Sequence, residues 1–123
     1  MGNLTGYGNL YTASESIIGT PGNATITFDG SVGSVLAPHG NYVSHAMTIG
    51  SGIEVNGGLG AIGYSSYGFT NNGVINANSN GEALSVTGGN WTNTGTLTSS
   101  NSGILNLGGT MVNTGLTQDL AGV

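Results

Sequence analysis

Apolar residues occur in short stretches in which every second residue is polar, and Gly, Asn, Ser and Thr separate these stretches. The segment Ala24–Phe28 alternates apolar residues with Thr, and the shorter segments Met47–Ile49 and Leu84–Val86 show the same alternation. A period of two buries one face of a strand, and no apolar periodicity of useful helical length occurs. The pattern predicts an all-β protein built of many brief strands separated by tight turns.

The C-terminal half contains three copies of one short motif. The segment FTNNGVI at 69–75 returns as WTNTGTL at 91–97 and as MVNTGLT at 111–117. A repeat of about 20 to 22 residues with two or three strands is the size of one coil of a β-helix. Coils stack at about 4.8 Å, the spacing of neighbouring strands in a sheet. We therefore predict a parallel β-helix, or β-solenoid, of four to five coils.

Each repeat contains an apolar residue, an Asn two positions later and a Gly two positions after that. In a stack of coils, like residues lie above one another. We expect the asparagines to form a ladder of side-chain amides, the apolar residues to form a buried column, and the glycines to recur at one turn. These nine structural ladder residues are Phe69, Asn71, Gly73, Trp91, Asn93, Gly95, Met111, Asn113 and Gly115.

A second motif lies between these copies and ends in a pair of glycines. It is Leu84–Gly89, it returns as Leu105–Gly109, and Ile53–Gly58 resembles both. The spacing between this last Gly pair and the next aromatic residue is longer, which predicts an insertion at 59–68. We expect one solenoid domain over 1–123, with less regular coils or a cap at 1–48 and repeat coils at 49–123.

The charge pattern excludes several classes of partner. The chain has no Lys, Arg or Cys and a formal net charge of −5. Without cationic side chains it cannot neutralise phosphates, so we expect no nucleic-acid binding, and it has no basic patch for an anionic membrane. No stretch approaches the length of apolar sequence that membrane insertion requires. The absence of Cys excludes a disulfide framework.

The string FTNNGVINANSNGEALSVTGGNWTNTGTLTSSNSGILNLGGTMVNTG at 69–115 resembles the repeats of large bacterial surface proteins. These are the autotransporter and filamentous-haemagglutinin-like adhesins, whose passenger domains are right-handed β-helices. The resemblance implies a right-handed coil, export, and a secreted or cell-surface location. No functional residue of the family maps onto a position of this chain.

Candidate chemistry is sparse. The histidines His39 and His45 have no metal-ligand spacing with each other or with Asp29 or Glu54, so we expect no metal site and no cofactor. A catalytic triad lacks the Gly-x-Ser-x-Gly elbow, and clustered carboxylates for glycoside hydrolysis are absent. We therefore expect no catalytic residues and no enzyme activity.

Two functions follow from this interpretation, and both stay open at this point. The first is a structural or adhesive solenoid whose partners are neighbouring coils of a longer chain, or host or matrix glycans or proteins. The alternative is a subunit that stacks end to end with other copies into an extracellular fibre. More distant alternatives are a fragment of a carbohydrate-active β-helix enzyme and an ice-binding solenoid. The last needs unbroken ranks of Thr-x-Thr, but Thr96 and Thr98 align with Val74 and Asn76.

Overall fold

The computed structural model of the chain describes residues 4–6, 9–12, 15–17, 24–38 and 47–120. The regular elements of this part are β-strands, and they pair in parallel. In chain order the strands are β1 (Leu4–Gly6), β2 (Asn9–Thr12), β3 (Glu15–Ile17), β4 (Ala24–Pro38), β5 (Met47–Ile49), β6 (Ile53–Ile62), β7 (Thr70–Asn71), β8 (Val74–Ala77), β9 (Ala83–Val86), β10 (Trp91–Asn93), β11 (Thr96–Ser100), β12 (Ile104–Leu107), β13 (Met111–Asn113) and β14 (Leu116–Leu120).

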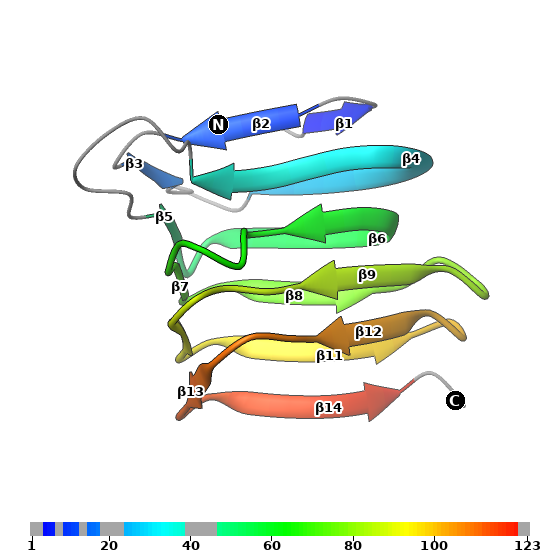
Figure 1. The fold of residues 1–123 in the computed structure, drawn as a ribbon. Helices are drawn as coiled ribbons and strands as arrows, with labels where there is room; N and C mark the ends of the chain where they lie inside the picture. Colours follow the sequence, from blue (N-terminus) through cyan, green and yellow to red (C-terminus); the bar gives the residue numbers. More distant parts are fainter. Residues whose placement is uncertain (1–3, 7–8, 13–14, 18–23, 39–46, 121–123) are drawn as a thin grey trace.

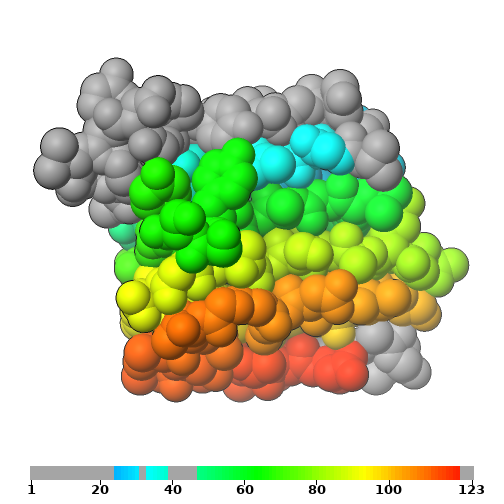
Figure 2. Space-filling model, viewed as in Figure 1, coloured from blue at the N-terminus to red at the C-terminus, as the bar shows by residue number. Residues whose placement is uncertain are grey.

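The strands wind into a β-solenoid of about four turns. Between β4 and β14 the chain runs along the back of the stack, returns along the front and descends with each turn, so the coil is right-handed (Figure 1). Figure 2 shows the coils as bands of colour that lie directly on one another from cyan to red. Both features confirm the predicted fold class, a right-handed parallel β-helix.

Each full coil has three faces. The first face contains β1, β8, β11, β14 and the first parts of β4 and β6. The second face contains β2, β9, β12 and the last parts of β4 and β6, because these two long strands continue around a corner. The third face is a separate five-stranded sheet of β3, β5, β7, β10 and β13.

The strand register reproduces the repeat found in the sequence. Leu97 lies between Ile75 of the coil before and Thr117 of the coil after. On the second face Leu84 pairs with Leu105, as the second motif predicts. Thr96 and Thr98 lie beside Val74 and Asn76 on one side and beside Leu116 and Gln118 on the other, so a Thr-x-Thr rank does not form there.

The core is a column of apolar side chains enclosed by the three faces. Alternate residues of the strands point into it, and the burial pattern of β8, β9 and β10 alternates accordingly. On the first face Ile26, Val55, Ile75 and Leu97 occupy one continuous inward column and are all buried. The hydrophobic effect therefore acts along the whole stack rather than at one centre.

Two predictions about the middle of the chain were wrong. Ile53–Gly58 is not the counterpart of Leu84–Gly89, because Val55 pairs with Ile75 on the first face and Ile62 pairs with Val86 on the second. The Gly pair at 57–58 lies inside β6, where Gly57 has a φ of +116° at the corner. Only glycine adopts such a conformation readily.

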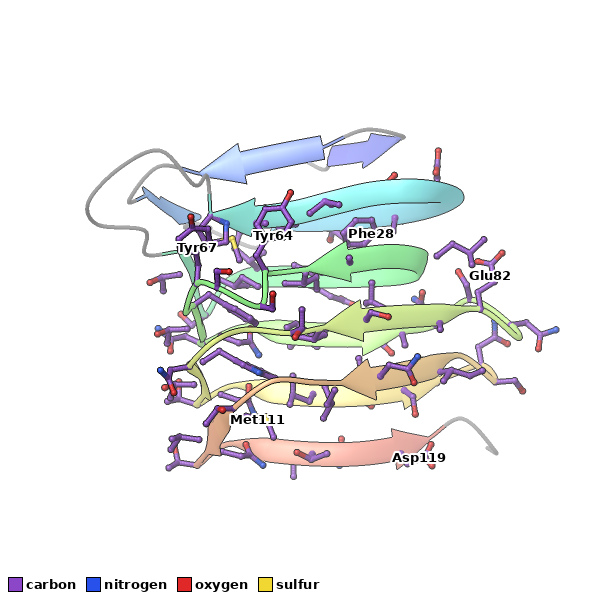
Figure 3. All side chains as sticks on the ribbon, in the orientation of Figure 1. Phe28, Tyr64, Tyr67, Glu82, Met111 and Asp119 are labelled. Carbon is purple, nitrogen blue, oxygen red and sulfur yellow. The ribbon has the colours of Figure 1, made fainter. Side chains whose placement is uncertain are left out.

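The insertion expected at 59–68 is shorter than predicted, since residues 60–62 belong to β6. Gly60 occupies the core position of Leu84, and a Cβ on Gly60 would overlap the ring of Phe28 from the coil before. The Phe28 side chain thus fills the volume that Leu84 fills one coil later. What remains outside the strands is a link at 63–69, on which Tyr64 and Tyr67 lie (Figure 3).

The N-terminal part is more regular than the sequence suggested where it is described. β4 extends over 15 residues and pairs with β6 through most of its length. The Asp-Gly sequence at 29–30, which favours a turn, forms a corner within β4, with a φ of +88° at Gly30. The sequence also favours a short strand at Tyr42–Val43, and these two residues lie outside the described part of the chain.

Candidate functional site: the interior ladders and the open C-terminal end

A ladder of asparagine amides follows the corner between the third and first faces. Asn71 Nδ2 donates to Asn93 Oδ1 at 2.7 Å, and Asn93 Nδ2 donates to Asn113 Oδ1 at 2.8 Å. Asn71 and Asn93 are fully buried, so these bonds satisfy amides that water cannot reach. The Gly73 and Gly115 amides also donate to Asn71 Oδ1 and Asn113 Oδ1, each at 3.2 Å. The ladder joins three coils without any charge.

The three repeat glycines allow the coils to approach at this corner. A Cβ on Gly73, Gly95 or Gly115 would overlap a backbone carbonyl oxygen of the preceding coil. None of the three has a positive φ. Glycine is therefore required here for space rather than for conformation.

The apolar members of the repeat form a second ladder inside the third face. The rings of Phe69 and Trp91 stack at a centroid distance of 4.9 Å and an interplanar angle of 9°. Met111 lies beside Trp91 in the strand register and is half-buried. Trp91 Nε1 donates to the Gly108 carbonyl at 2.9 Å, so the buried indole has a polar partner. Trp91 belongs to the core and is not a surface platform for sugars.

The stack is open at its C-terminal end within the described residues. β12 pairs with β9 on one side and has no described strand on the other, while β13 and β14 form the last described strands of their faces. The Ile104 amide donates to the Glu82 carbonyl and the Gly108 amide to the Val86 carbonyl. Because alternate residues of a strand in a parallel sheet bond to opposite neighbours, the Leu105 and Leu107 amides are directed to the open side.

The interior of the solenoid is accessible at this end. Leu107 is 40% exposed, whereas Val86 at the same register position one coil earlier is 1% exposed. A cavity of about 600 Å³ opens here. Its lining comes from the last coil and a half: Ser99, Ser102, Gly103, Ile104, Leu105, Leu107, Thr117, Gln118 and Asp119.

In β14, the last described strand of the first face, both columns of inward-pointing residues end in a polar residue. Thr117 continues the column of Ile75 and Leu97, and Asp119 continues the column of Ala77 and Ser99. Ser99 is 7% exposed and its hydroxyl donates to Asp119 Oδ1 at 2.7 Å. Figure 3 shows Asp119 on β14 at the lower end of the stack. The mouth of the solenoid is thus apolar on the second face and polar on the first.

The sequence did not single out the Ser99–Asp119 pair. The column that leads to it reads Phe28, Gly57, Ala77, Ser99, Asp119, which has no recurring residue type. The only signal available in the sequence was the length of the repeat, because this spacing places Asp119 beside Ser99.

The other candidate residues do not converge. His39 and His45 lie outside the described residues. Asp29 is exposed at the corner of β4, and Glu54 is half-exposed on the first face, where its Oε1 accepts a hydrogen bond from Asn56 Nδ2 at 3.2 Å. Among the described residues no three His, Cys, Asp or Glu side chains are grouped as metal ligands.

The described part of the chain also contains no helix that is long and apolar enough to cross a membrane. In comparisons with known proteins, no family model, no curated protein and no solved structure matches this chain. The structure establishes a β-solenoid of about four turns.

Proposed function

We propose that this protein is a non-enzymatic structural or adhesive β-solenoid of a secreted or cell-surface bacterial protein, and that further coils continue it at its C-terminal end. The observation that carries the proposal is the open edge of β12 beside the cavity at this end. An uncovered coil offers a row of unpaired backbone groups and an incomplete core, and solenoids cover such ends.

The exposed apolar area supports continuation by another coil. Covering Leu105 and Leu107 as completely as Leu84 and Val86 would bury two leucine side chains that are now partly exposed. Burial of this kind contributes about 1–2 kcal/mol, in addition to the backbone hydrogen bonds of a new strand. Each repeat unit of a solenoid gains stability mainly from such contacts with its neighbours.

The use of the polar repeat residues supports a structural role. Asn71 and Asn93 are buried and bonded to each other, and Asn72, which is exposed, accepts a hydrogen bond from Thr94 of the next coil at 2.5 Å. The polar groups that recur in the sequence therefore join coils together. The likeness of residues 69–115 to adhesin repeats supports the bacterial surface as the location.

A fibre of stacked copies is the second candidate, and the N-terminal edge favours it. β1, β2 and β3 occupy the same three faces as β14, β12 and β13, and all strands are parallel. The two ends of the solenoid therefore present edges that can pair head to tail. Such a contact does not close and would grow into a fibre.

An extended chain tests continuation directly. Ser100 pairs with Leu120, so a second copy of residues 101–120 placed after Leu120 would set a new strand against β12 in the existing register. The copy carries Asp119→Ser, so that the new strand does not set a second carboxylate beside Asp119. We expect its unfolding midpoint in urea to exceed that of the present chain. The matched control carries Leu105→Ser and Leu107→Ser within the copy, and it should lose the gain.

Failure of the extended chain to gain stability over its control would contradict continuation at this end. The location requires a separate experiment. Antibodies raised against the purified chain should label intact cells of the bacterium that makes it. Labelling that requires permeabilised cells would contradict a surface or secreted role.

A further inference from the structure

We infer that Asn90 is an acceptor site for N-linked glycosylation, at which a sugar is joined to the nitrogen of the side-chain amide. This modification goes beyond the proposed function, because it concerns the outer surface of the solenoid and not the stacking of its coils. It leaves the open end accessible to a further coil or to another copy, since Asn90 does not line the cavity there.

Asn90 begins the sequence Asn90-Trp91-Thr92, which fits the pattern Asn-x-Ser/Thr of N-glycosylation sites. The pattern also occurs at 3–5 and 23–25, where Asn3 and Asn23 lie outside the described residues. In a chain rich in Asn, Ser and Thr the pattern alone does not identify a site. Access to the amide nitrogen decides whether a match can be modified.

The Asn90 side chain is accessible. It is exposed at the bend between β9 and β10, where the chain passes from the second face to the third. Its amide forms no hydrogen bond with another described residue. By contrast, the exposed Asn72 accepts a hydrogen bond from the Thr94 hydroxyl. Asn101 Nδ2 likewise donates to the Asn78 carbonyl at 3.1 Å. The nitrogen that a glycosyltransferase would modify is therefore available at Asn90.

The strand geometry presents both ends of the pattern on the outer surface. Successive side chains of a strand point to opposite faces. Trp91 is 1% exposed and stacks on Phe69 in the core, so Asn90 and Thr92 on either side of it face outward. Thr92 is half-exposed. A sugar on Asn90 would consequently stand outside the solenoid and leave the core unchanged.

The backbone of the bend is held by the coils on both sides. The Trp91 amide donates to the Thr110 carbonyl of the next coil at 2.9 Å. On the other side a Cβ on Gly68 would overlap the Asn90 carbonyl oxygen, so the coil before approaches this bend closely. The amide therefore projects from a fixed backbone, and an attached sugar need not displace a strand.

The corner that carries Asn90 lies away from the carboxylates. From residue 24 onward the carboxylates belong to the first face or to its corner with the second face: Asp29, Glu54, Glu82 and Asp119. Figure 3 shows Glu82 where the chain turns from β8 to β9, at the opposite end of the second face from the turn into β10. A glycan is bulky and solubilising. On Asn90 it would hydrate a corner of the solenoid where these carboxylates do not lie.

The modification exchanges one bond for another. The amide nitrogen of Asn90 forms a bond to the anomeric carbon of the sugar of a glycosyl diphosphate. The bond between that carbon and the phosphate oxygen breaks, the diphosphate leaves, and the nitrogen loses one proton. No group is oxidised or reduced. Thr92 supplies the hydroxyl that the pattern requires two residues after the acceptor.

Mass spectrometry of the chain purified from the organism that makes it tests the assignment. Cleavage after the glutamates of the denatured chain gives a fragment beginning at residue 83, in which 90–92 is the one match to the pattern. It also gives the fragment 55–82, which contains several asparagines and no match. We expect the first fragment to exceed its calculated mass by one or more sugar residues located on Asn90, and fragment 55–82 to have its calculated mass. An unmodified first fragment would overturn the assignment.

Three variants produced in the same organism separate an acceptor site from an incidental adduct. Asn90→Gln and Thr92→Ala should each lose the sugar, whereas Thr92→Ser keeps the hydroxyl and should retain it. Persistence of the sugar in Asn90→Gln or Thr92→Ala, or its loss in Thr92→Ser, would overturn the assignment. Circular dichroism of each variant shows whether the solenoid is folded. These outcomes do not depend on whether an extended chain gains stability, so they are distinct from failure of the proposed function.

Discussion

The asparagine ladder gives the sharpest prediction about what holds the coils together. Asn93 is its middle member, is fully buried, and has a short side-chain hydrogen bond on each side, from Asn71 at 2.7 Å and to Asn113 at 2.8 Å. Asn93→Ala removes both bonds. Because Asn71 is also fully buried, water cannot replace the acceptor that its amide loses. The oxygen of Asn113 is exposed and can bond to water instead.

The magnitude follows from this asymmetry. The buried Asn71 amide loses its shortest hydrogen bond and keeps two of 3.3 Å, to the Gly73 and Thr96 carbonyls, which costs about 1–3 kcal/mol. The loss at the exposed Asn113 oxygen costs about 0.5–1 kcal/mol. Asn93→Ala should therefore lower the free energy of unfolding by about 1.5–4 kcal/mol, a large part of the total of about 5–15 kcal/mol for an ordinary domain. The matched control is Asn90→Ala, which removes an exposed asparagine from the same coil.

Urea unfolding followed by tryptophan fluorescence provides the assay, since Trp91 is the only Trp and lies in the core. We expect Asn90→Ala to change the free energy of unfolding by less than about 0.5 kcal/mol, as is usual for surface substitutions. A change of less than about 0.5 kcal/mol for Asn93→Ala as well would show that the ladder does not stabilise the stack.

Three further predictions concern packing and access. Trp91→Ala should cost about 3–5 kcal/mol in urea unfolding followed by circular dichroism; a loss below about 0.5 kcal/mol would place the indole outside the core. Gly60→Ala should cost about 1–3 kcal/mol because its methyl group meets an aromatic ring, whereas Gly108→Ala has space and should be neutral or slightly stabilising. Chymotrypsin should cut the folded chain after Tyr64 or Tyr67, on the link outside the strands, before it cuts after Trp91; the reverse order would contradict the coil assignment.

The repeated part of the fold could be predicted from the sequence for a physical reason. Asn at the ladder position and Gly two residues later are required by contacts between coils, so the same residue types recur wherever the coil recurs. Asn93 bonds to its counterparts on both sides, and a side chain on Gly95 would overlap the coil before. Such constraints are visible as a period in a single sequence.

The middle of the chain could not be predicted in the same way, because different residues fill equivalent volumes. At Gly60 the sequence shows no apolar residue, since the ring of Phe28 occupies that part of the core. Asp119 also has no counterpart of its own type in the earlier coils. Only the strand register reveals that Gly60 replaces Leu84 and that Asp119 follows Ser99.

Amide hydrogen exchange shows whether the C-terminal end is a surface on which a further coil stacks. The Leu105 and Leu107 amides should exchange rapidly in the present chain at low concentration, while those of Leu84 and Val86, one coil earlier, exchange slowly. In the chain extended by residues 101–120 with Asp119→Ser in the copy, all four amides should exchange slowly. Slow exchange of Leu105 and Leu107 without the extension, or rapid exchange with it, would contradict the claim.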